Sequence, residues 1–308
     1  MRIIRDIDEL STVADPTGIA LGTFDGLHIG HQEVIRTMIG ECHKHNLKSC
    51  VFTFANHPRE LTSNHGAPPR ILSLEDKITL LESWGVDYLV LLKFDKRLMS
   101  VEATDFVEKM LLEDLRMKYL VVGYDFRFGK GAKGNVGMLQ EYSDTNGFSM
   151  HKVEPVEFEG EKISSSRIRE RLMEGDIDAV TRLLGRHHWV SGEVIKGKQV
   201  GAKLGFPTAN LNISSNMTLI KPGVYITKTW VQGDLFYSVT NVGFNPTFDQ
   251  ENFNVETHIL EFDKDIYGEI ITVEFHKRIR DELKMNSLEQ LVEFIERDVR
   301  DTEDHFGI

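Results

Sequence analysis

Two histidines flank a glycine near the N-terminus, directly after a short apolar run, and this segment constrains the fold more than any other. Residues 21–31 read Leu-Gly-Thr-Phe-Asp-Gly-Leu-His-Ile-Gly-His and precede an amphipathic stretch. The order predicts a strand, a glycine-rich turn and the start of a helix. A helix N-terminus presents unpaired backbone N–H groups and a partial positive charge, so it suits a phosphate group.

His28 and His31 add chemistry to this turn. Two imidazoles placed there can donate hydrogen bonds to phosphoryl oxygens as charge develops in a transition state. Gly26 and Gly30 allow the backbone to approach a ligand closely. The same histidine spacing also suits a pair of metal ligands or two surface residues, but the glycines and the preceding strand favour phosphate.

Short apolar runs alternate with helical patterns in the first part of the chain. The runs lie at 19–21, 50–54, 88–92 and 119–122, and the helical patterns lie near 30–46, 74–84 and 102–113. This alternation predicts an α/β domain, in which a parallel sheet carries helices on both faces. Ligands bind at the carboxyl ends of the strands in such sheets, where the two-histidine turn lies.

The pattern changes near residue 185. Short alternating runs then dominate between residues 189 and 275, separated by turn signals such as 221–223 and 232–234. Regular short strands of this kind predict an antiparallel β-barrel. A helical stretch follows, in which Ser287 and Gln290 have the spacing of a capping box. We therefore expect two domains, 1–184 and 185–308.

Charge and cysteine content exclude several classes of protein. The 308 residues carry a formal net charge of −12, shared evenly by the two expected domains, so neither resembles a basic nucleic-acid-binding domain. Cys42 and Cys50 cannot form a disulfide framework or a zinc pattern by themselves, and we expect buried thiols. No apolar run has the length of a membrane span and the N-terminal residues lack a signal-peptide core. We expect a cytoplasmic protein without a membrane or nucleic-acid partner.

Two loops that follow predicted strands are candidate sites. Residues 52–60 contain Asn56 and His57 in a polar loop. Residues 123–130 contain Asp125, Phe126 and Arg127, where aromatic faces can sandwich a ring and a basic group can meet phosphate. The aromatic residues of this loop can equally be half-buried anchors.

Residues 163–169 open a predicted helix with three consecutive serines. Ser164 and Ser165 can cap the helix, and the same hydroxyls can hold an anion together with Arg167 and free N–H groups. Both interpretations can be true together. Residues 129–134 also fit GxGxxG, but they do not directly follow the first strand of their unit, which disfavours a dinucleotide-dependent oxidoreductase.

The second domain contains a string suited to ATP with a divalent cation. Residues 205–210 read Gly-Phe-Pro-Thr-Ala-Asn. Thr208 and Asn210 offer hard oxygen ligands for Mg²⁺, which bridges ATP phosphates, and Gly205 permits close backbone approach. A turn with local hydrogen bonds is the alternative. Glu256 can accept the proton of a substrate hydroxyl, but an alternating strand also allows it to face solvent.

These segments together resemble one family. Residues 22–31 resemble the HxGH signature of the nucleotidyltransferase superfamily, and the wider form GxFDGxHxGHQ is similar to the bacterial bifunctional riboflavin kinase/FMN adenylyltransferase (FAD synthetase) family. Residues 52–60 resemble its FTFEPHPRE segment, 123–130 its GxDFRFGK motif and 163–169 its ISSTxIR motif. In the second domain 205–210 match GFPTAN, 254–260 resemble VExHLL and 278–282 resemble KRLRDE. The resemblance extends from residue 21 to residue 299.

The resemblance implies a Rossmann-like nucleotidyltransferase domain followed by an antiparallel riboflavin kinase barrel with a terminal helix. It implies phosphorylation of riboflavin by ATP to FMN in the barrel, and transfer of AMP from ATP to FMN in the first domain, giving FAD and pyrophosphate. Riboflavin, FMN and ATP would be the small-molecule partners and Mg²⁺ the cofactor.

The resemblance also gives candidate roles to individual residues. The catalytic candidates are His28, His31, Arg167 and Glu256. The ATP-binding candidates are Gly22, Phe24, Gly30, Ser164, Ser165, Gly205, Thr208 and Asn210. Thr208 and Asn210 are also the metal-ligand candidates. The flavin-binding candidates are Asn56, His57, Asp125, Phe126, Arg127 and Arg280.

Departures from the family pattern leave alternatives open. Ala55 and Asn56 replace Glu-Pro before His57, and Phe244 and Asn245 occupy variable positions of the NIGxxPTF loop. A monofunctional FAD synthetase with an inactive or regulatory kinase-like domain is one alternative. A flavin-binding regulator is another, and an adenylyltransferase for a different substrate would leave the second domain without a purpose. The sequence predicts no oligomeric state.

Overall fold

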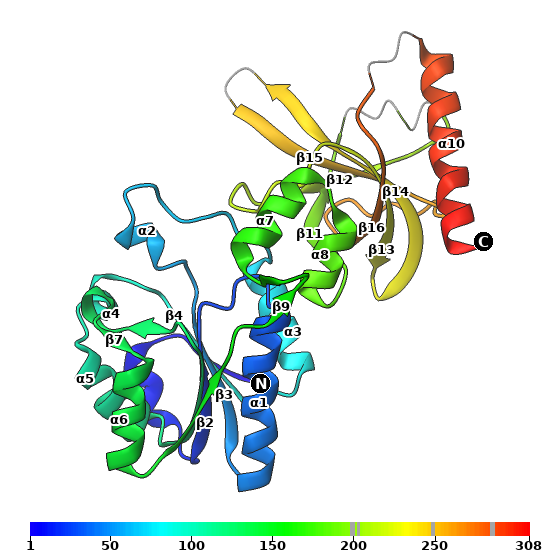
Figure 1. Cartoon of the computed structure of the whole chain (residues 1–308). Helices are drawn as coiled ribbons and strands as arrows, with labels where there is room; N and C mark the ends of the chain where they lie inside the picture. The colour runs from blue at the N-terminus through cyan, green and yellow to red at the C-terminus, as the bar shows by residue number, and fades with distance from the viewer. Residues whose placement is uncertain (198–200, 202–203, 248–249, 284–286) are drawn as a thin grey trace. The chain divides into compact units, whose positions relative to one another are not determined.

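The computed structural model describes residues 1–197, 201, 204–247, 250–283 and 287–308. Its contacts divide the chain into two compact units, both drawn in Figure 1. The first comprises Met1–Pro68 and Leu74–Ser164, and the second comprises Pro69–Ser73 and Ser165–Ile308. The second unit therefore includes helices α7 (Ser165–Glu174) and α8 (Ile177–Leu184), which the sequence analysis grouped with the first domain, because α8 packs on strands of the barrel.

A six-stranded parallel sheet forms the centre of the first unit, with the strand order β1-β4-β3-β2-β5-β8. The strands are β1 (Arg2–Ile4), β2 (Thr17–Leu21), β3 (Lys48–Phe54), β4 (Tyr88–Leu92), β5 (Met117–Gly123) and β8 (Ser149–Val153). All five residues of β2 are buried, as expected for a central strand covered on both faces. The parallel pairing confirms the predicted α/β fold.

Helices connect these strands over both faces of the sheet. Helices α1 (Ile29–His45) and α3 (Leu74–Ser83) lead from β2 to β3 and from β3 to β4, whereas η2 (Phe106–Asp114) and α6 (Val136–Asn146) lead to β5 and β8. Figure 1 shows α1 and α6 on opposite sides of the sheet. The strand order reverses at β2, and ligands bind beyond the carboxyl ends of the strands at such a reversal.

Shorter elements complete the first unit. They are η1 (Ile7–Thr12), α2 (Arg59–Thr62), α4 (Lys96–Met99), α5 (Ala103–Asp105), η3 (Lys130–Ala132) and the two-stranded ribbons β6 (Arg127–Phe128) with β7 (Gly134–Asn135) and β9 (Glu157–Phe158) with β10 (Glu161–Lys162). The GxGxxG string at residues 129–134 thus lies in the ribbon of β6 and β7 and contains the short helix η3. It does not follow the first strand of its unit, as the sequence analysis argued.

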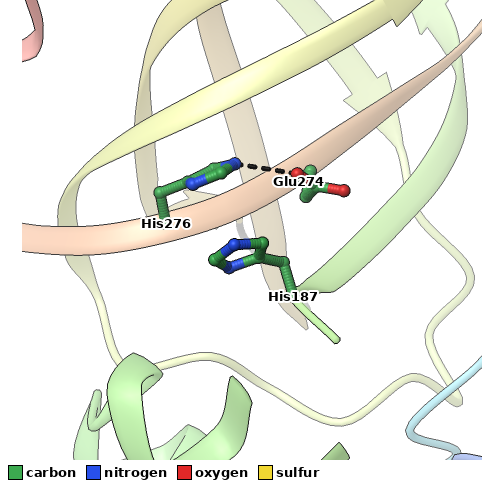
Figure 2. A group of neighbouring side chains, drawn as sticks. All are labelled: His187, Glu274 and His276. Atoms are coloured by element: carbon green, nitrogen blue, oxygen red, sulfur yellow. Dashed lines mark hydrogen bonds and ion pairs between the residues drawn. The ribbon is translucent and has the colours of Figure 1, made fainter. Parts of the chain in front are cut away.

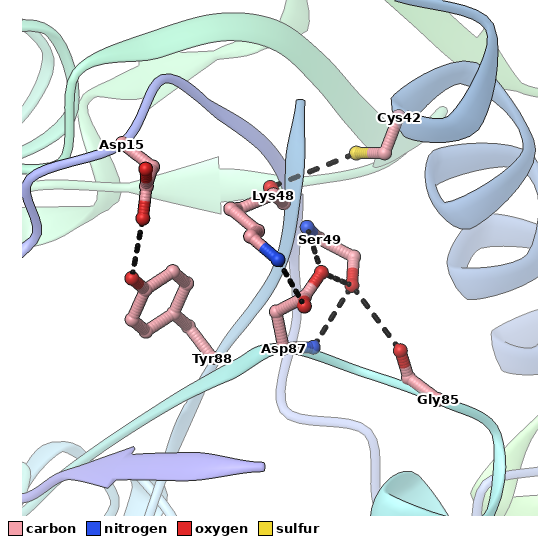
Figure 3. Close-up of polar contacts among 7 residues, drawn as sticks. All are labelled: Asp15, Cys42, Lys48, Ser49, Gly85, Asp87 and Tyr88. Carbon is pink, nitrogen blue, oxygen red and sulfur yellow. Dashed lines mark hydrogen bonds and ion pairs between the residues drawn. The ribbon is translucent and has the colours of Figure 1, made fainter. Parts of the chain in front are cut away.

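A polar network joins the start of β3 to the residue before β4, at the amino ends of these strands (Figure 3). The Asp87 carboxylate accepts hydrogen bonds from the Ser49 N–H and hydroxyl, both at 2.9 Å, and from the Lys48 ammonium at 3.1 Å. Burial raises the pKa of Asp87, but these hydrogen bonds outweigh it and hold the pKa below its usual value. The network joins the start of β3 to the segment before β4 and so fixes their register.

Both cysteines are buried free thiols, as predicted. Burial raises the pKa of the Cys42 thiol to about 11, and its sulfur lies 3.7 Å from the Lys48 carbonyl oxygen. A thiol with so high a pKa is not a nucleophile at neutral pH. The cysteines therefore pack the core and take no part in the chemistry discussed below.

The second unit is built on a closed antiparallel barrel with the strand order β11-β12-β15-β14-β13-β16. The strands are β11 (His188–Ile195), β12 (Ala209–Asn212), β13 (Gly223–Val231), β14 (Asp234–Thr247), β15 (Gln250–Ile259) and β16 (Ile270–Arg280), and helix α10 (Leu288–Phe306) follows them. Ser287 caps α10 by accepting the Gln290 N–H, as its spacing predicted. The barrel and terminal helix confirm the expected fold.

Hydroxyl groups line part of the barrel interior, which the alternating sequence pattern did not predict. Thr227, Thr229, Ser238, Thr240 and Thr257 are fully buried. Their hydroxyls form a chain of hydrogen bonds, with Thr227 Oγ1 2.7 Å from both Ser238 Oγ and Thr240 Oγ1, and Thr240 Oγ1 2.9 Å from Thr257 Oγ1. Each buried polar group thus has a partner, which removes the cost of burying it.

Candidate active sites

The HxGH turn joins β2 to α1 through a backbone with several left-handed residues. Phe24, Gly26 and Leu27 have φ values of 47°, 76° and 44°. A left-handed conformation costs free energy at the two non-glycine positions, and such strain persists where surrounding packing enforces it. The Phe24 and Leu27 side chains are 1% and 0% exposed. Their burial therefore holds the strained turn in place at the carboxyl end of β2.

Two glycines of the turn make room for aromatic rings. A Cβ atom on Gly22 would lie 2.8 Å from Phe24 Cε1, and one on Gly30 would lie 3.3 Å from the His28 ring. The sequence analysis expected Gly30 to admit a ligand to the backbone. The structure adds that these glycines let the Phe24 and His28 rings fold back over the turn.

The two imidazoles lie against each other at the start of α1. The rings of His28 and His31 stack with centroids 3.6 Å apart and planes 18° apart, and the Phe24 ring meets His31 edge-on at 5.4 Å. His28 caps the helix, because its Nδ1 accepts the His31 N–H at 3.3 Å. A neutral His28 with Nδ1 as acceptor carries its proton on Nε2, which makes Nε2 a hydrogen-bond donor.

His31 is a neutral group at physiological pH. Burial, then the neighbouring His28, then Lys77 lower the pKa of His31 well below its usual value. Its Nδ1 atom is buried and has no hydrogen-bond partner among the residues that the structure describes. Such an unsatisfied polar atom is expensive in a folded protein unless a bound ligand or water uses it.

Lys77 is a buried cation beside this turn that sequence reasoning missed. It lies on α3, is 7% exposed, and its ammonium donates to the Thr23 carbonyl oxygen at 3.0 Å. Thr53 Oγ1 donates to the same carbonyl at 3.0 Å. The helical spacing could have indicated its burial. Lys77 lies four residues before Leu81, so both side chains share the face of α3 that packs inward. Lys77 thus places positive charge next to the His31 imidazole, whose pKa it helps to lower.

The loop after β3 uses Asn56 to bind backbone. The Asn56 side-chain oxygen accepts the Phe94 N–H at 2.7 Å, and its amide nitrogen donates to the Phe94 carbonyl at 3.1 Å and to Glu60 at 3.0 Å. His57 Nδ1 accepts the Arg59 N–H at 3.1 Å. The departure from the family pattern at Asn56 therefore joins the ends of β3 and β4, and a flavin contact by Asn56 stays a prediction.

The loop after β5 has one anchored and one exposed part. The rings of Phe126 and Phe128 stack 5.8 Å apart, and Phe128 packs into the core against Phe106. Asp125 and Arg127 are exposed, and Asp125 forms an ion pair with Lys162 at 2.8 Å. The anchor interpretation thus fits Phe128, and contacts of Asp125, Phe126 and Arg127 with flavin stay predictions.

The serine-rich segment opens helix α7, as predicted. The helix begins at Ser165, and Ser164, Ser165 and Arg167 are all half-buried at its start. Ser164 belongs to the first compact unit, whereas Ser165 and Arg167 belong to the second. One turn further on, the Arg169 guanidinium donates to the Pro69 carbonyl oxygen at 2.7 Å, which ties α7 to residues 69–73.

In the second unit, the Gly-Phe-Pro-Thr-Ala-Asn segment leads into β12. Gly205 has a φ of 90°, a conformation that favours glycine. His258 on β15 contacts the segment twice, with Nδ1 2.8 Å from the Pro207 carbonyl oxygen and its ring 5.5 Å from that of Phe206. These contacts hold the segment against β15, two residues along from Glu256.

Asn210 and Glu256 face each other across neighbouring strands. Asn210 of β12 is the register partner of Glu256 on β15, and Asn254 also donates a hydrogen bond to the Glu256 carboxylate. Asn210 is 8% exposed, and a Cβ atom on Gly197 would lie 2.4 Å from its amide nitrogen. The register thus places Asn210 and Glu256 side by side on one face of the barrel, and a shared site with Thr208 stays a prediction.

Arg280 forms an ion pair that the sequence did not reveal. Its guanidinium donates twice to the Asp298 carboxylate of α10, at 3.0 and 2.6 Å, and lies 5.3 Å from the centre of the Phe294 ring. Asp298 is 2% exposed. This pair holds α10 on the barrel, and a contact of Arg280 with flavin stays a prediction.

A parallel sheet that ends in an HxGH turn, followed by a closed barrel with a GFPTAN loop, defines a nucleotidyltransferase joined to a small-molecule kinase. The sequence matches the FAD synthetase family over residues 11–167 and the riboflavin kinase family over residues 184–306. The chain belongs to the bifunctional riboflavin kinase/FMN adenylyltransferase family. It is an enzyme with both transferase activities, which use riboflavin, FMN and ATP.

Relatives match over the full chain. The bifunctional riboflavin kinase/FMN adenylyltransferase of Haemophilus influenzae is 36% identical over 100% of both chains, and that of Escherichia coli K12 is 34% identical over 100% of this chain and 99% of its own. A solved structure described as a macrolide-efflux protein from Streptococcus pneumoniae has a TM-score of 0.89 and 32% identity, and covers 98% of both chains. Within the described part of this chain, no helix has the length and apolar character needed to cross a membrane.

Proposed function

We propose that the HxGH turn carries out adenylyl transfer to FMN and that the loop containing Thr208 and Asn210 serves the phosphorylation of riboflavin. The observation that carries the first assignment is the stacking of His28 on His31 at the N-terminus of α1, where the pKa of the buried His31 is lowered well below its usual value. The second assignment is supported by the register pairing of Asn210 with Glu256.

In adenylyl transfer, a phosphate oxygen of FMN attacks the α-phosphorus of ATP, the new P–O bond forms and the bond to pyrophosphate breaks. No protein nucleophile is needed, so catalysis depends on positioning and on stabilisation of charge. His28 donates from Nε2 to a phosphoryl oxygen, and His31 binds beside it as a neutral imidazole. Lys77 and the α1 N-terminus supply positive potential.

Further groups have nucleotide-binding roles in our proposal. Gly22, Phe24 and Gly30 shape the turn that receives ATP. Ser164, Ser165 and Arg167, at the start of α7, offer hydroxyl and guanidinium groups that can each bind phosphate oxygens. Among the flavin candidates, His57, Phe126 and Arg127 retain side-chain surface at the loops after β3 and β5. Asn56 and Arg280 already hold structural partners, so we place them at the periphery of the flavin sites.

In the kinase reaction, the terminal hydroxyl of the riboflavin side chain attacks the γ-phosphorus of ATP and ADP leaves. Glu256 accepts the hydroxyl proton as general base. The donor set fits Mg²⁺, because Thr208 and Asn210 offer neutral oxygen atoms and Asn210 is the register partner of Glu256. Mg²⁺ held by Thr208 and Asn210 would neutralise charge on the ATP phosphates. Gly205 allows the backbone to approach those phosphates.

Product analysis with Glu256→Gln tests the kinase assignment. The variant keeps a similar shape but cannot accept a proton, so we expect FMN formation from riboflavin to fall by about 10²-fold or more. FAD formation from supplied FMN should remain at the wild-type rate. Glu269→Gln, at an exposed position before β16, is the matched control. Normal FMN formation by Glu256→Gln would remove Glu256 from the reaction.

The location of the protein and its oligomeric state lie outside this proposal. A cytoplasmic location stays a prediction of the sequence. Sedimentation of the purified chain with and without flavin would determine the oligomeric state.

A further inference from the structure

A cluster of two imidazoles and one carboxylate lies on the barrel, on strands other than those that carry Asn210 and Glu256. It consists of His187, Glu274 and His276, and one ligand atom from each residue lies within 4.8 Å of the others. Figure 2 shows the His276 ring joined to Glu274, with the His187 ring facing both. All three side chains are half-buried. We refer to these residues as the histidine–glutamate cluster.

The strand register explains why these side chains meet. His188 of β11 pairs with Phe275 of β16, so His187 lies beside His276 at the next position. On its other side, β16 pairs Lys277 with Ile226 and Phe275 with Thr227 of β13, which leaves His276 at a register shift. A β-bulge of this kind redirects a side chain. Here the His276 Nε2 atom lies 2.8 Å from a Glu274 carboxylate oxygen.

The donor set of the cluster suits a metal ion. Two imidazole nitrogens and one carboxylate oxygen all lie within 4.8 Å of one another. Imidazole and carboxylate are both ordinary ligands of divalent transition metals. Two imidazoles with one carboxylate are also a common ligand set for Zn²⁺ with an open position.

A simple ion pair between Glu274 and His276 is the competing explanation, and the charged groups named around the cluster are basic. Lys228, Lys277 and His305 lie near it, and the His276 ring meets Phe306 edge-on at 5.1 Å. An ion pair between Glu274 and His276 does not explain the second imidazole, since the His187 ring lies 3.9 Å from the His276 ring.

We propose that His187, Glu274 and His276 bind one divalent transition-metal ion of the Zn²⁺ type, with a remaining position open to water. Ligand atoms around a tetrahedral Zn²⁺ lie about 3.3 Å apart, because each bond is about 2.0 Å long. The three side chains must therefore close slightly around the ion. His187 Nδ1 lies 3.4 Å from Thr181 Oγ1 of α8, a contact of the kind that orients a ligating histidine through its second nitrogen.

Binding at this cluster would affect stability rather than the two reactions directly. His187 belongs to the connection between α8 and β11, whereas Glu274 and His276 belong to β16. A shared ion would join the entry of the barrel to one of its longer strands. A ligand that binds only the folded state stabilises it by RT ln(1 + L/Kd), where L is the free ligand concentration, so the unfolding temperature rises with the concentration of free metal.

Calorimetric titration of the full chain with Zn²⁺, after removal of metal by a chelator, tests the proposal. We expect saturable binding that His187→Gln, Glu274→Gln and His276→Gln each weaken by at least about tenfold. His305→Gln is the matched control, because its ring is 6.4 Å from that of His276 and lies outside the cluster. It should bind Zn²⁺ as the wild type does. Wild-type affinity in all three cluster variants, or no saturable binding by the wild type, would overturn the proposal.

Co²⁺ absorption gives a second readout that does not depend on how much heat each variant releases. Bound Co²⁺ should show visible bands that are lost in His187→Gln, a substitution that lies outside any strand or helix. Thiolate charge-transfer bands should be absent, because Cys42 and Cys50 are buried thiols. Excess Mg²⁺, which prefers oxygen ligands, should leave the bands unchanged. Thiolate bands, or displacement by Mg²⁺, would contradict binding at the histidine–glutamate cluster.

Discussion

His31 contributes to adenylyl transfer as a neutral group in our proposal. Burial, then His28 and Lys77, lower the pKa of His31 well below its usual value, so it does not act as a fixed positive charge. We expect the positive charge at this site to come from Lys77, which is held by the Thr23 carbonyl. A neutral imidazole beside a fixed cation can stabilise a phosphoryl transition state without titrating near neutral pH.

Removing the Lys77 ammonium should slow adenylyl transfer and spare the kinase reaction. We expect Lys77→Met to lower FAD formation from FMN by at least about tenfold, because positive potential is lost where the phosphate charge develops. The Thr23 carbonyl keeps its hydrogen bond from Thr53, so the turn should remain folded. Steady-state rates of FAD and FMN formation are the measurement. Lys118→Met, at an exposed position of β5, is the control, and an equal loss in both variants would exclude a specific role.

His188 makes the stability of the barrel depend on pH. It is 2% exposed, and burial, then Arg186, lower its pKa from 6.5 to about 3. As the pH falls below 6.5, the unfolded chain binds a proton that the folded barrel does not, so stability declines until the pH approaches 3. The slope for one proton is about 1.4 kcal/mol per pH unit.

Urea unfolding at several pH values checks this expectation. In His188→Phe, the unfolding free energy should fall less steeply with decreasing pH, by the contribution of about one proton. In His43→Phe, at an exposed position of α1, the slope should stay unchanged. Identical slopes for the wild type and His188→Phe would show that another group causes the loss of stability at acidic pH.

Among the elements, α10 depends on one ion pair more than on its apolar face. The Arg280 guanidinium and the Asp298 carboxylate form two hydrogen bonds, and the Asp298 side chain is 3% exposed. Truncating one partner leaves the other charge without compensation in a largely buried position. Such losses typically cost about 3–5 kcal/mol.

Asp298→Ala should therefore destabilise the barrel by about 3 kcal/mol and release α10 before the strands. Hydrogen exchange of the α10 amides, compared with those of β13 and β16, is the measurement. Asp304→Ala, at an exposed position of the same helix, should have little effect. Unchanged α10 protection in Asp298→Ala would contradict the importance of the pair.

Local sequence patterns predicted the helices and strands well. They did not predict contacts between side chains on different elements. The apolar run 19–21 and the turn after it placed β2, the HxGH turn and α1 correctly, because their signals are contained in consecutive residues. The partners of Asn56, Lys77 and Arg280 lie on other elements. No local pattern identifies such partners, and the hydroxyl chain inside the barrel was missed for the same reason.

The chain as a whole consumes ATP in two different ways, and its two compact units match two families. Phosphorylation transfers the γ-phosphate, whereas adenylylation transfers the part of ATP that contains the α-phosphate. The buried thiols and the oxygen-rich kinase loop fit this division, since neither reaction requires a covalent enzyme intermediate. FMN is the product of one site and the substrate of the other.

Radiolabelled ATP measures the two transfers separately in one chain. Riboflavin and Mg²⁺ are supplied with ATP labelled at either the γ- or the α-phosphate, and the flavins are separated by chromatography. The wild type should place γ-label in FMN and FAD and α-label in FAD alone. His28→Ala should still place γ-label in FMN but lose α-label from flavin by about 10²-fold or more. Normal α-labelling of FAD by His28→Ala would contradict an adenylyl-transfer site at the HxGH turn.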